Sequence, residues 1–422
     1  MALKVNLWGQ LLGALDYTTS TGVSYFQFNP ACPAALRNAA PILMPPTRDA
    51  SKVYGPFHVR SHPAYDGLPP MLADSLPDSF GNDMLRTYLK LRNKPHEMTV
   101  EQRLCYVGNR GMGALEYWPR LLGDVHSPDN LELTRLAALS HAISGSELPA
   151  QQITRGLLNH LFLVGTSAGG ARPKALVSIH SETNQLTITE AHKPGFVPVV
   201  LKFDQPNTQH ASQPLSLGKI EYIYHRMATN CGIRMSQCGL LKQEPLQHFV
   251  TARFDRTKTG EKLHMQTLAA IAGMPPNQLH DYDDVFGTLL KLGLPYRDLE
   301  ELFTRMVFNL LSANDDCHTK NTAFLMDEQG QWSLAPAYDL TFPYEVRRVW
   351  KRPHPISING KTTNIQLNDV LEVAKRFGVK RPKTTIARVQ DALAEWPKLA
   401  DRYRLDRASA STIPTYFQRL LS

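Results

Sequence analysis

Hydrophobic and polar residues alternate at the beginning of the chain. Leu3, Val5 and Leu7 form one such segment, and residues 23–28 form a second, with a turn of Thr, Ser and Gly between them. Alternation with a period of two is typical of strands that bury one face. The pattern therefore predicts a small sheet within the first 30 residues.

Helical patterns follow this sheet and lead to a predicted domain boundary. Residues 71–91 are expected to form a turn and then a helix, and residues 131–144 a connecting helix. Ser, Gly and Pro interrupt the pattern at 145–152, which is where we place the boundary. Residues 1–150 are accordingly expected to form an N-terminal subdomain.

Short strands dominate the middle of the chain, so a strand-rich lobe is predicted over residues 151–256. Its expected elements are a hairpin of strands 174–180 and 185–191, a strand at 196–203, a helix at 219–233 and a strand at 248–256. The four residues Ser-Glu-Thr-Asn between the first two strands are a hairpin signal.

Helices replace strands after residue 257. Apolar residues in 297–314 recur every three or four positions, which predicts a long amphipathic helix, and further helices are expected at 367–378 and 384–404. Asp298 followed by Glu301 resembles a capping box at the start of the first helix. The predicted fold class is α+β, with two lobes: a strand-rich one carrying the added N-terminal subdomain, and an all-helical one over 257–422.

Composition narrows the protein class. Apolar residues make up 42% and charged residues 20% of 422, as in soluble globular proteins, and no 18-residue apolar run occurs. The first residues lack the layout of a signal peptide. Five scattered cysteines form no CxxC pair, so we expect free thiols in a reducing cytoplasm and no structural zinc. The net charge of +8 favours acidic partners such as nucleotide, nucleic acid or an acidic protein, but a solvated basic surface explains it equally well.

The segment Asp-Asp-Cys-His-Thr-Lys-Asn (315–321) directly follows the long predicted helix. Asp316 and Asn321 have the D-x-x-x-x-N spacing of a kinase catalytic loop, in which the Asp accepts the substrate hydroxyl proton and the Asn holds magnesium. A predicted hairpin follows and ends at Asp339, which should therefore return beside Asn321. Oxygen ligands of this kind suit magnesium bound to phosphates.

The remaining parts of a phosphotransfer site precede this loop in the expected order. Lys202 lies in an apolar strand, where a lysine can contact phosphates, and Glu221 in the next helix is its natural partner. Residues 165–174 are rich in Gly and suited to phosphate, although they do not form a Walker A loop. Residues 252–256 come at the end of the last predicted strand of the lobe, which is the position of the interlobe hinge that binds adenine in kinases.

Each part has an ordinary structural explanation when taken alone. A strand lysine is usually a solvated edge charge, paired glycines usually form a turn, and a single His such as His318 is more often structural. Cys317 is expected to be incidental, and Asp315 to be solvated or to cap the loop. The order of all the parts along the chain carries the kinase hypothesis.

The motifs together resemble the HipA family of serine/threonine kinases, which are toxins of bacterial toxin–antitoxin systems. The segments that carry the resemblance are 72–81, 108–119, 169–175, 199–203, 220–228, 252–256, 315–321, 334–340 and 356–361. The resemblance covers residues 1 to about 400 and implies a protein-kinase-like fold. The sequence departs from the family pattern in two places. One is the region after the hinge, and the other is Ala252, where well-known members have Glu.

The family resemblance implies roles for individual residues. Asp316 would be the catalytic base, and Asn321 and Asp339 would be the magnesium ligands. The residues expected at the ATP phosphates are Lys202 (with Glu221), His318, Gly169 and Gly170, and those expected at adenine are Phe254 and its neighbour Asp255. The expected site of autophosphorylation is Ser167, next to Thr166. The resemblance also implies a HipB-like helix-turn-helix antitoxin as a separate chain, DNA contact only through that antitoxin, and an aminoacyl-tRNA synthetase as a possible substrate.

Two other functions stay open. The chain could be a non-catalytic co-repressor that binds a helix-turn-helix partner and DNA, although intact Lys202, Asp316, Asn321 and Asp339 argue against lost activity. It could also be a metal-dependent hydrolase using Asp315, Asp316, His318 and Asp339, but a second histidine at ligand spacing is missing.

Overall fold

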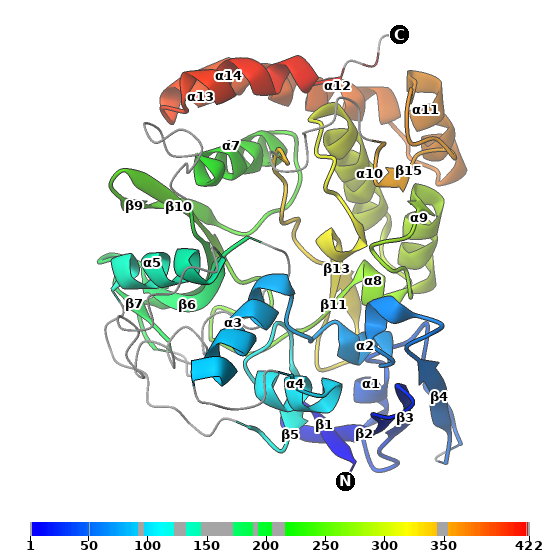
Figure 1. The fold of residues 1–422 in the computed structure, drawn as a ribbon. Helices are drawn as coiled ribbons and strands as arrows, with labels where there is room; N and C mark the ends of the chain where they lie inside the picture. Colours follow the sequence, from blue (N-terminus) through cyan, green and yellow to red (C-terminus); the bar gives the residue numbers. More distant parts are fainter. Residues whose placement is uncertain are drawn as a thin grey trace.

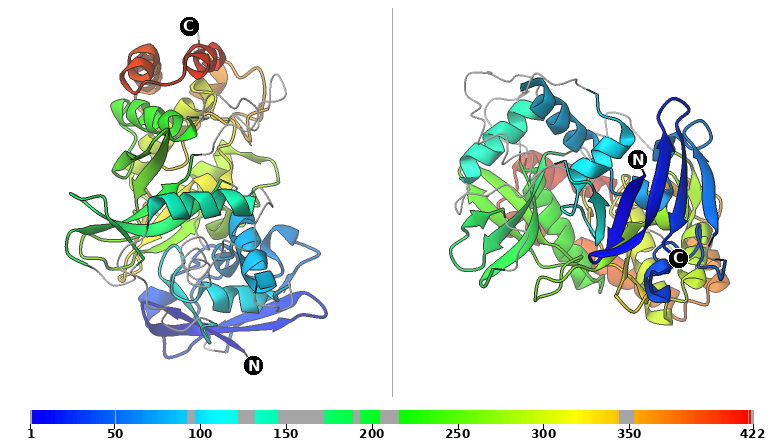
Figure 2. Two further views of the ribbon diagram at one scale, coloured as in Figure 1. Left: turned by 60° about the vertical axis from the view of Figure 1, so that its left-hand side comes forward. Right: turned by 90° about the horizontal axis from the view of Figure 1, so that it is seen from below.

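The structure is a computed structural model, and it describes residues 2–49, 51–91, 97–121, 132–144, 172–188, 193–204, 216–343, 353–418 and 420. The two ends of the chain lie at opposite ends of the molecule, the first sheet at one end and the last helices at the other (Figure 1; Figure 2). No helix among the described residues has the length and apolarity needed to cross a bilayer. All five cysteines are free, as the sequence predicted.

The N-terminal subdomain contains a five-stranded antiparallel sheet in the order β4-β3-β2-β1-β5. Its strands are β1 (Leu3–Leu7), β2 (Gln10–Thr18), β3 (Val23–Phe28), β4 (Val53–His58) and β5 (Leu115–Trp118). The predicted alternating segments are β1 and β3, and β1 alternates in burial as expected. The intervening β2 pairs with both of them.

The described residues of the same subdomain also form five helices. They are α1 (Ala34–Arg37), α2 (Pro70–Ala73), α3 (Ser79–Leu91), α4 (Val100–Val107) and α5 (Leu133–Ser144), with a short 3-10 helix, η1 (Pro63–Tyr65). The predicted turn and helix at 71–91 and the connecting helix are confirmed by α2, α3 and α5. The predicted boundary at 145–152 lies outside the described residues.

A second five-stranded sheet forms the strand lobe, in the order β7-β6-β8-β10-β9. Its strands are β6 (Lys174–His180), β7 (Leu186–Thr187), β8 (Phe196–Lys202), β9 (Cys238–Gln243) and β10 (Leu246–Ala252), and α7 (Leu217–Asn230) packs on β9 and β10. One face of this sheet packs Val199 and Leu201 against Phe80 and Leu136 of α3 and α5. Because strand side chains alternate, Lys202 points to the opposite face.

The described part of the helical lobe contains the longest helix of the described residues and two small sheets. Its helices are α8 (Leu268–Ile271), α9 (Tyr282–Lys291), α10 (Tyr296–Leu311), α11 (Leu367–Arg376), α12 (Pro382–Ala394), α13 (Trp396–Arg402) and α14 (Arg407–Thr412), with two 3-10 helices, η2 (Thr319–Asn321) and η4 (Ile413–Tyr416). Its strands are β11 (His264–Thr267), β12 (His280–Asp281), β13 (Ala323–Met326), β14 (Trp332–Leu334) and β15 (Ile356–Ser357). The expectation of an all-helical lobe was therefore wrong.

The expected cap of α10 is also corrected. The helix begins after Pro295, which provides no side-chain cap, and Asp298 lies inside its first turn. The carboxylate of Asp298 is buried and binds Arg234 at 2.8 Å. The spacing of Asp298 and Glu301 resembles a capping box. The helix nevertheless begins earlier, because the last extended residue before it is Pro295, three residues before Asp298.

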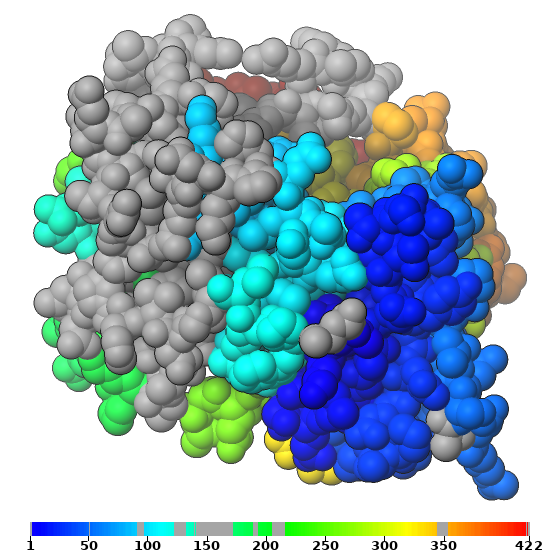
Figure 3. Space-filling model, turned by 60° about the horizontal axis from the view of Figure 1, so that its bottom comes forward, coloured from blue at the N-terminus to red at the C-terminus, as the bar shows by residue number. Residues whose placement is uncertain are grey.

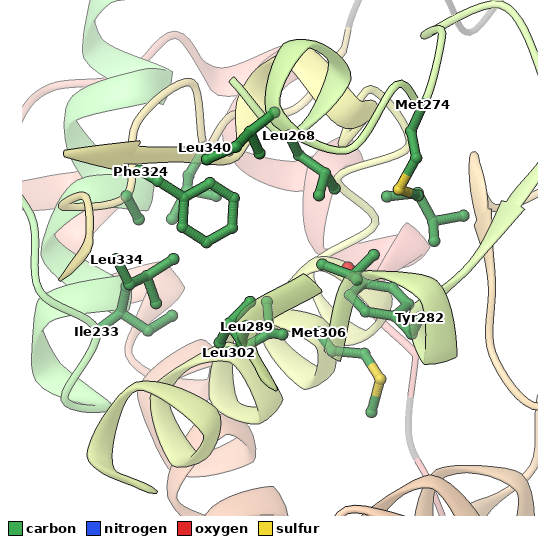
Figure 4. Close-up of a cluster of buried hydrophobic side chains, with 14 of the residues drawn as sticks. Ile233, Leu268, Met274, Tyr282, Leu289, Leu302, Met306, Phe324, Leu334 and Leu340 are labelled. Carbon is green, nitrogen blue, oxygen red and sulfur yellow. The ribbon is translucent and has the colours of Figure 1, made fainter. Parts of the chain in front are cut away.

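A continuous apolar core lies beneath the candidate site. Figure 4 shows side chains from α9, α10, β13 and β14 meeting there, among them Tyr282, Leu302, Met306 and Phe324. Burying one such side chain contributes about 1.5–3 kcal/mol. The core makes a rigid base for the segment that leaves α10, which we call the catalytic-loop segment (residues 312–322).

The N-terminal subdomain packs against both other parts of the molecule. Seen from the side of the first sheet, its blue and cyan residues cover a large part of the surface (Figure 3). Tyr65 donates a hydrogen bond to the carbonyl of Ala269 at 2.7 Å, and Asp74 accepts from the backbone and hydroxyl of Thr267, each at 2.7 Å. These bonds connect α2 and η1 to the start of α8.

Candidate active site

A cavity of about 330 Å³ lies where the three parts of the molecule meet. Its walls include Val200, Lys202, Glu221, Phe249, Ala252 and Phe254 from the strand lobe and hinge, His318, Lys320, Asn321, Tyr338 and Asp339 from the helical lobe, and Asp74, Asp78 and Met112 from the N-terminal subdomain. Ligand pockets in proteins are commonly about 300–1,000 Å³. The size and the mixed lining fit a nucleotide.

Lys202 forms the centre of a charged cluster in this cavity. Its ammonium lies 2.6 Å from Glu221 Oε1 and also contacts the carboxylate of Asp339. Burial alone would lower the pKa of Lys202, but the carboxylates of Asp339 and Glu221 outweigh it and the pKa is raised. Burial would likewise raise the pKa of Asp339, whereas Lys202 and Lys174 bring it down to about 2. Lys202 and Asp339 are therefore both charged at neutral pH.

The catalytic-loop segment brings Asp316, His318 and Asn321 together. Asn321 Nδ2 donates to the carbonyl of Asp316 at 2.8 Å, and the His318 amide donates to the same carbonyl at 2.8 Å. The Asp316 side chain is exposed and is not part of the cavity wall. Asp316 thus lies at the rim, where a group arriving from solvent can reach it, while His318 and Asn321 face the cavity.

The predicted hairpin is confirmed as β13 and β14, whose residues pair as Phe324 with Leu334. It returns the chain so that Asp339 and Asn321 line the same cavity. Asp339 has φ +57°, a backbone conformation that is uncommon for residues other than glycine and that often occurs at functional sites. Tyr338, beside it, donates to the carbonyl of Lys320 and so ties the end of the hairpin to the loop.

The hinge residues separate into two roles. Phe254 lines the cavity, and its ring lies 5.4 Å from that of Tyr338. Asp255 is fully buried away from the cavity lining, where it accepts from Arg253, from Arg256 and from the Gly113 amide, each at 2.7 Å. Asp255 was expected beside the nucleotide, but its carboxylate instead connects the hinge to the N-terminal subdomain.

Residues 165–171 of the Gly-rich segment lie outside the described residues, and with them Gly169, Gly170, Thr166 and the expected phosphorylation site Ser167. Arg172 is the first described residue of this segment. Its guanidinium donates to Glu221 Oε2 at 3.0 Å, to Asp204 Oδ1 at 3.0 Å and to the carbonyl of Phe203 at 3.2 Å. Glu221 is therefore shared between Arg172 and Lys202.

Sequence reasoning did not find the contribution of the N-terminal subdomain. Asp74, Asp78 and Met112 line the cavity, and Asp78 Oδ2 lies 3.1 Å from the buried ammonium of Lys174. Burial raises the pKa of Asp74, and Lys320 partly opposes this effect. These acids stand in a stretch that reads as an ordinary turn before a helix, so only their packing against the other lobes reveals a role.

Comparison with known proteins now identifies the chain. Residues 166–396 match the HipA-like C-terminal domain, and residues 3–118 match the HipA N-terminal domain. The chain belongs to the HipA family. Two putative kinases of Sinorhizobium fredii, Y4dM and Y4mE, are 33% and 30% identical to it over 102 and 126 residues, or 23% and 27% of the chain. These matches span only 25% and 30% of the relatives' own lengths.

A solved structure shows the HipA fold over nearly the whole chain. It is the complex of HipA, HipB and operator DNA from the Shewanella oneidensis MR-1 toxin–antitoxin system, matched with a TM-score of 0.64 and 15% identity. The match covers 98% of this chain and 94% of that one. This confirms the expected α+β, HipA-like kinase fold.

The residues present fit ATP and magnesium. The carboxylate of Asp339 and the amide oxygen of Asn321 are hard oxygen ligands on the same cavity, and Lys202 provides a cation for phosphate. Asn321 uses its Nδ2 toward Asp316, which leaves its oxygen for a cation. Among the described residues, His318 Nδ1 is buried without a hydrogen-bond partner. The described part of the chain contains no group of three or more His, Cys, Asp or Glu side chains placed to hold a metal.

Proposed function

We propose that this HipA-family chain is an ATP- and magnesium-dependent serine/threonine protein kinase, and that it acts as the toxin of a toxin–antitoxin system. One observation carries the proposal: the Lys202–Glu221 pair meets Asp339 and Asn321 in one cavity, with Asp316 at its rim. Phosphoryl transfer depends mainly on positioning and on charge stabilisation, and these residues supply both.

Each residue has a defined task in this mechanism. Lys202, oriented by Glu221, binds the phosphates of ATP, and magnesium held by Asn321 and Asp339 supplies neutralising charge when bound. His318 faces the same side of the cavity and can donate a hydrogen bond to phosphate oxygen. Asp316 accepts the proton of a serine or threonine hydroxyl that approaches from solvent. Phe254 and Tyr338 provide an apolar wall for adenine.

The biological role extends the same proposal. The solved HipA is in complex with HipB and operator DNA. We propose that a HipB-like helix-turn-helix antitoxin, as a separate chain, binds this protein too, and that DNA is contacted through that antitoxin. A translation component such as an aminoacyl-tRNA synthetase is the proposed substrate, and Ser167 in the Gly-rich loop the proposed site of autophosphorylation.

The first prediction tests the catalytic base. Asp316→Ala should leave ATP affinity nearly unchanged but slow phosphoryl transfer by about 10²–10⁴-fold, because it removes the group that accepts the proton. Transfer is followed by intact mass after incubation with magnesium and ATP, and by phosphopeptide mapping around residues 166–167.

Glu328→Ala is the matched control, since Glu328 is an exposed carboxylate in the turn of the β13–β14 hairpin. Undiminished phosphorylation in Asp316→Ala would refute the assignment of the base. A wild-type protein that gains no phosphate mass under any magnesium concentration would refute the kinase activity and favour the co-repressor.

A further inference from the structure

The catalytic-loop segment has a thiol on its inner side that the proposed chemistry does not use. Cys317 lies between Asp316 and His318, but whereas Asp316 is exposed and His318 faces the cavity, Cys317 is only 5% exposed. Its Sγ lies 3.5 Å from Nε2 of His354, which is 4% exposed. The pair joins residues 37 positions apart in the sequence.

The direction of this hydrogen bond follows from the other side of the imidazole. Nδ1 of His354 lies 2.6 Å from the carbonyl of Ile356, and a carbonyl can only accept, so Nδ1 carries the proton. In the neutral ring Nε2 then has a free lone pair, and the Cys317 thiol is the donor. Burial lowers the pKa of His354 to about 4 and raises the pKa of Cys317 well above its ordinary value. Both groups are therefore neutral at physiological pH.

His354 is itself held firmly by the helical lobe. The carbonyl that it binds belongs to Ile356 in β15, which pairs with His280 of β12. Its ring lies 6.1 Å from that of Tyr282, a residue that starts α9 and lies in the apolar core (Figure 4). The hydroxyl of Tyr282 also hydrogen-bonds Cys317 and accepts from Asn309 of α10 at 3.4 Å.

Two other bonds hold the ends of the same segment. Asn314 Nδ2 donates to Asn309 Oδ1 at 3.0 Å near its start, and the Thr319 hydroxyl donates to the carbonyl of Met274 at 2.8 Å near its end. Cys317 lies between these two points. Its contact with His354 is therefore placed to fix the middle of the segment, where the chain turns from Asp316 to His318.

We infer that Cys317 is a positioning residue, whose Sγ–H···Nε2 hydrogen bond to His354 keeps Asp316 and His318 in place for phosphoryl transfer. The inference rests on the proposed kinase activity. A misplacement of about 1 Å at a reacting group can cost about 100-fold in rate. Lys202 and Asp339 are carried by β8 and by the end of the hairpin, so nucleotide binding should depend much less on this bond.

The test compares Cys317→Ala, which removes the donor, with Cys317→Ser, which keeps one. In Cys317→Ala we expect kcat to fall by about 10- to 100-fold while KM for ATP changes by less than about twofold. Cys317→Ser should recover most of kcat. His354→Leu loses the same bond, together with the bond from Nδ1 to the Ile356 carbonyl, so its kcat should fall at least as far as in Cys317→Ala. Adding Cys317→Ala to His354→Leu should lower kcat little further, because the Cys317–His354 bond is already lost.

Cys231→Ala is the matched control. Cys231 is a fully buried thiol that donates to the carbonyl of Ala228 at 3.1 Å, at the end of α7 and outside the cavity wall. The Cys231→Ala variant therefore measures how much kcat falls when any buried thiol is removed. A kcat in Cys231→Ala as low as in Cys317→Ala, or equal kcat in Cys317→Ala and Cys317→Ser, would overturn the inference.

Amide hydrogen exchange of residues 314–321 gives a measurement that does not depend on activity. Exchange should be faster in Cys317→Ala than in the wild type, and should return toward wild type in Cys317→Ser. If the wild-type protein transfers no phosphate, the proposed function fails, and exchange alone still decides whether Cys317 holds the segment. Unchanged exchange in Cys317→Ala would refute the positioning role.

Discussion

The carboxylate of Asp255 is completely buried, yet it stays charged because cations surround it. It lies 2.7 Å from guanidinium nitrogens of Arg253 and Arg256, and it also accepts from the Gly113 amide. Burial would raise the pKa of Asp255, but the two arginines outweigh it and bring the pKa down to about 2. This cluster fixes the hinge against the N-terminal subdomain.

Asp255→Asn should destabilise the protein by about 3–5 kcal/mol at pH 7, because Arg253 and Arg256 would keep their buried charges without a carboxylate. The folded-state pKa of about 2 is below the unfolded value of about 3.9, so the ionised carboxylate contributes its stability above about pH 4. That contribution is lost as the pH falls from about 4 to 2.

Thermal unfolding at pH 7, 4 and 2.5 measures this difference, with Asp401→Asn, a change at an exposed site on α13, as the control. The advantage of the wild type over Asp255→Asn should shrink at the lowest pH. An advantage that is the same at pH 7 and pH 2.5 would contradict the assignment of Asp255 as the anion of this cluster.

The same residue shows what the sequence could and could not predict about the site. Lys202, Glu221, Asn321 and Asp339 all line one cavity, because the order and spacing of the motif require a strand, a helix and a hairpin that converge. Asp255 follows Phe254 directly, and both lie in the turn after β10, where no strand alternation sets the direction of the side chains. Which of the two faces the cavity depends on the packing of the hinge on the N-terminal subdomain, which no local pattern encodes.

At the scale of elements, Arg172 connects the end of β8 to the start of α7. It binds the carbonyl of Phe203 and the carboxylates of Asp204 and Glu221. Asp204 in turn accepts from the Gly218 amide at 2.7 Å in the first turn of α7. At Gly218 a Cβ would lie 2.3 Å from the carbonyl of Gln247, so only glycine lets the helix approach β10 this closely.

Arg172→Lys keeps the charge but loses the planar fork that reaches three acceptors. Glu221 should then orient Lys202 less well, and KM for ATP should rise by roughly tenfold, which corresponds to about 1.4 kcal/mol. Steady-state kinetics measures this. Arg135→Lys is the control, since Arg135 forms an exposed pair with Glu132. An unchanged KM in Arg172→Lys would show that Arg172 does not act on Lys202 through Glu221.

Elements with long periodic patterns were predicted well, and short ones were not. The helix α10 carries clear apolar periodicity, the strands β6 and β8 are runs rich in apolar residues, and the β13–β14 hairpin has a Gly-containing turn. By contrast, β12 and β15 have two residues each and pair with one another across more than 70 positions. Two residues have no measurable period, so their pairing is a product of tertiary packing.

At the scale of the whole molecule, the N-terminal subdomain and the strand lobe share a buried ion pair beside the cavity. Lys174 is 3% exposed and lies 3.1 Å from Asp78 Oδ2. It is opposite Lys202 in the β6–β8 pairing, so two lysines stand side by side in the sheet. Burial lowers the pKa of Lys174, and Asp78 is the first of the groups that oppose this effect. No local pattern indicates this pair, because its partners belong to parts of the chain nearly 100 residues apart.

Asp78→Asn should therefore destabilise the molecule by about 3–5 kcal/mol, because the charge of Lys174 stays buried without its counterion. Asn retains an oxygen for the Gly81 amide, which donates to Asp78 Oδ1 at 2.6 Å, so the start of α3 should be preserved. Adding Lys174→Met should restore much of the lost stability, since an apolar side chain of similar size can replace a buried charge.

The stability of the folded protein should also depend on pH through Lys174. Because folding lowers the pKa of Lys174, stability rises with pH below the ordinary lysine value of about 10.4, and this rise should be steeper in Asp78→Asn. Thermal unfolding of the wild type, Asp78→Asn and the double variant at pH 7 and pH 9.5 tests both statements. Equal unfolding temperatures for Asp78→Asn and the double variant at pH 7 would show that the buried charge of Lys174 is not what the pair neutralises.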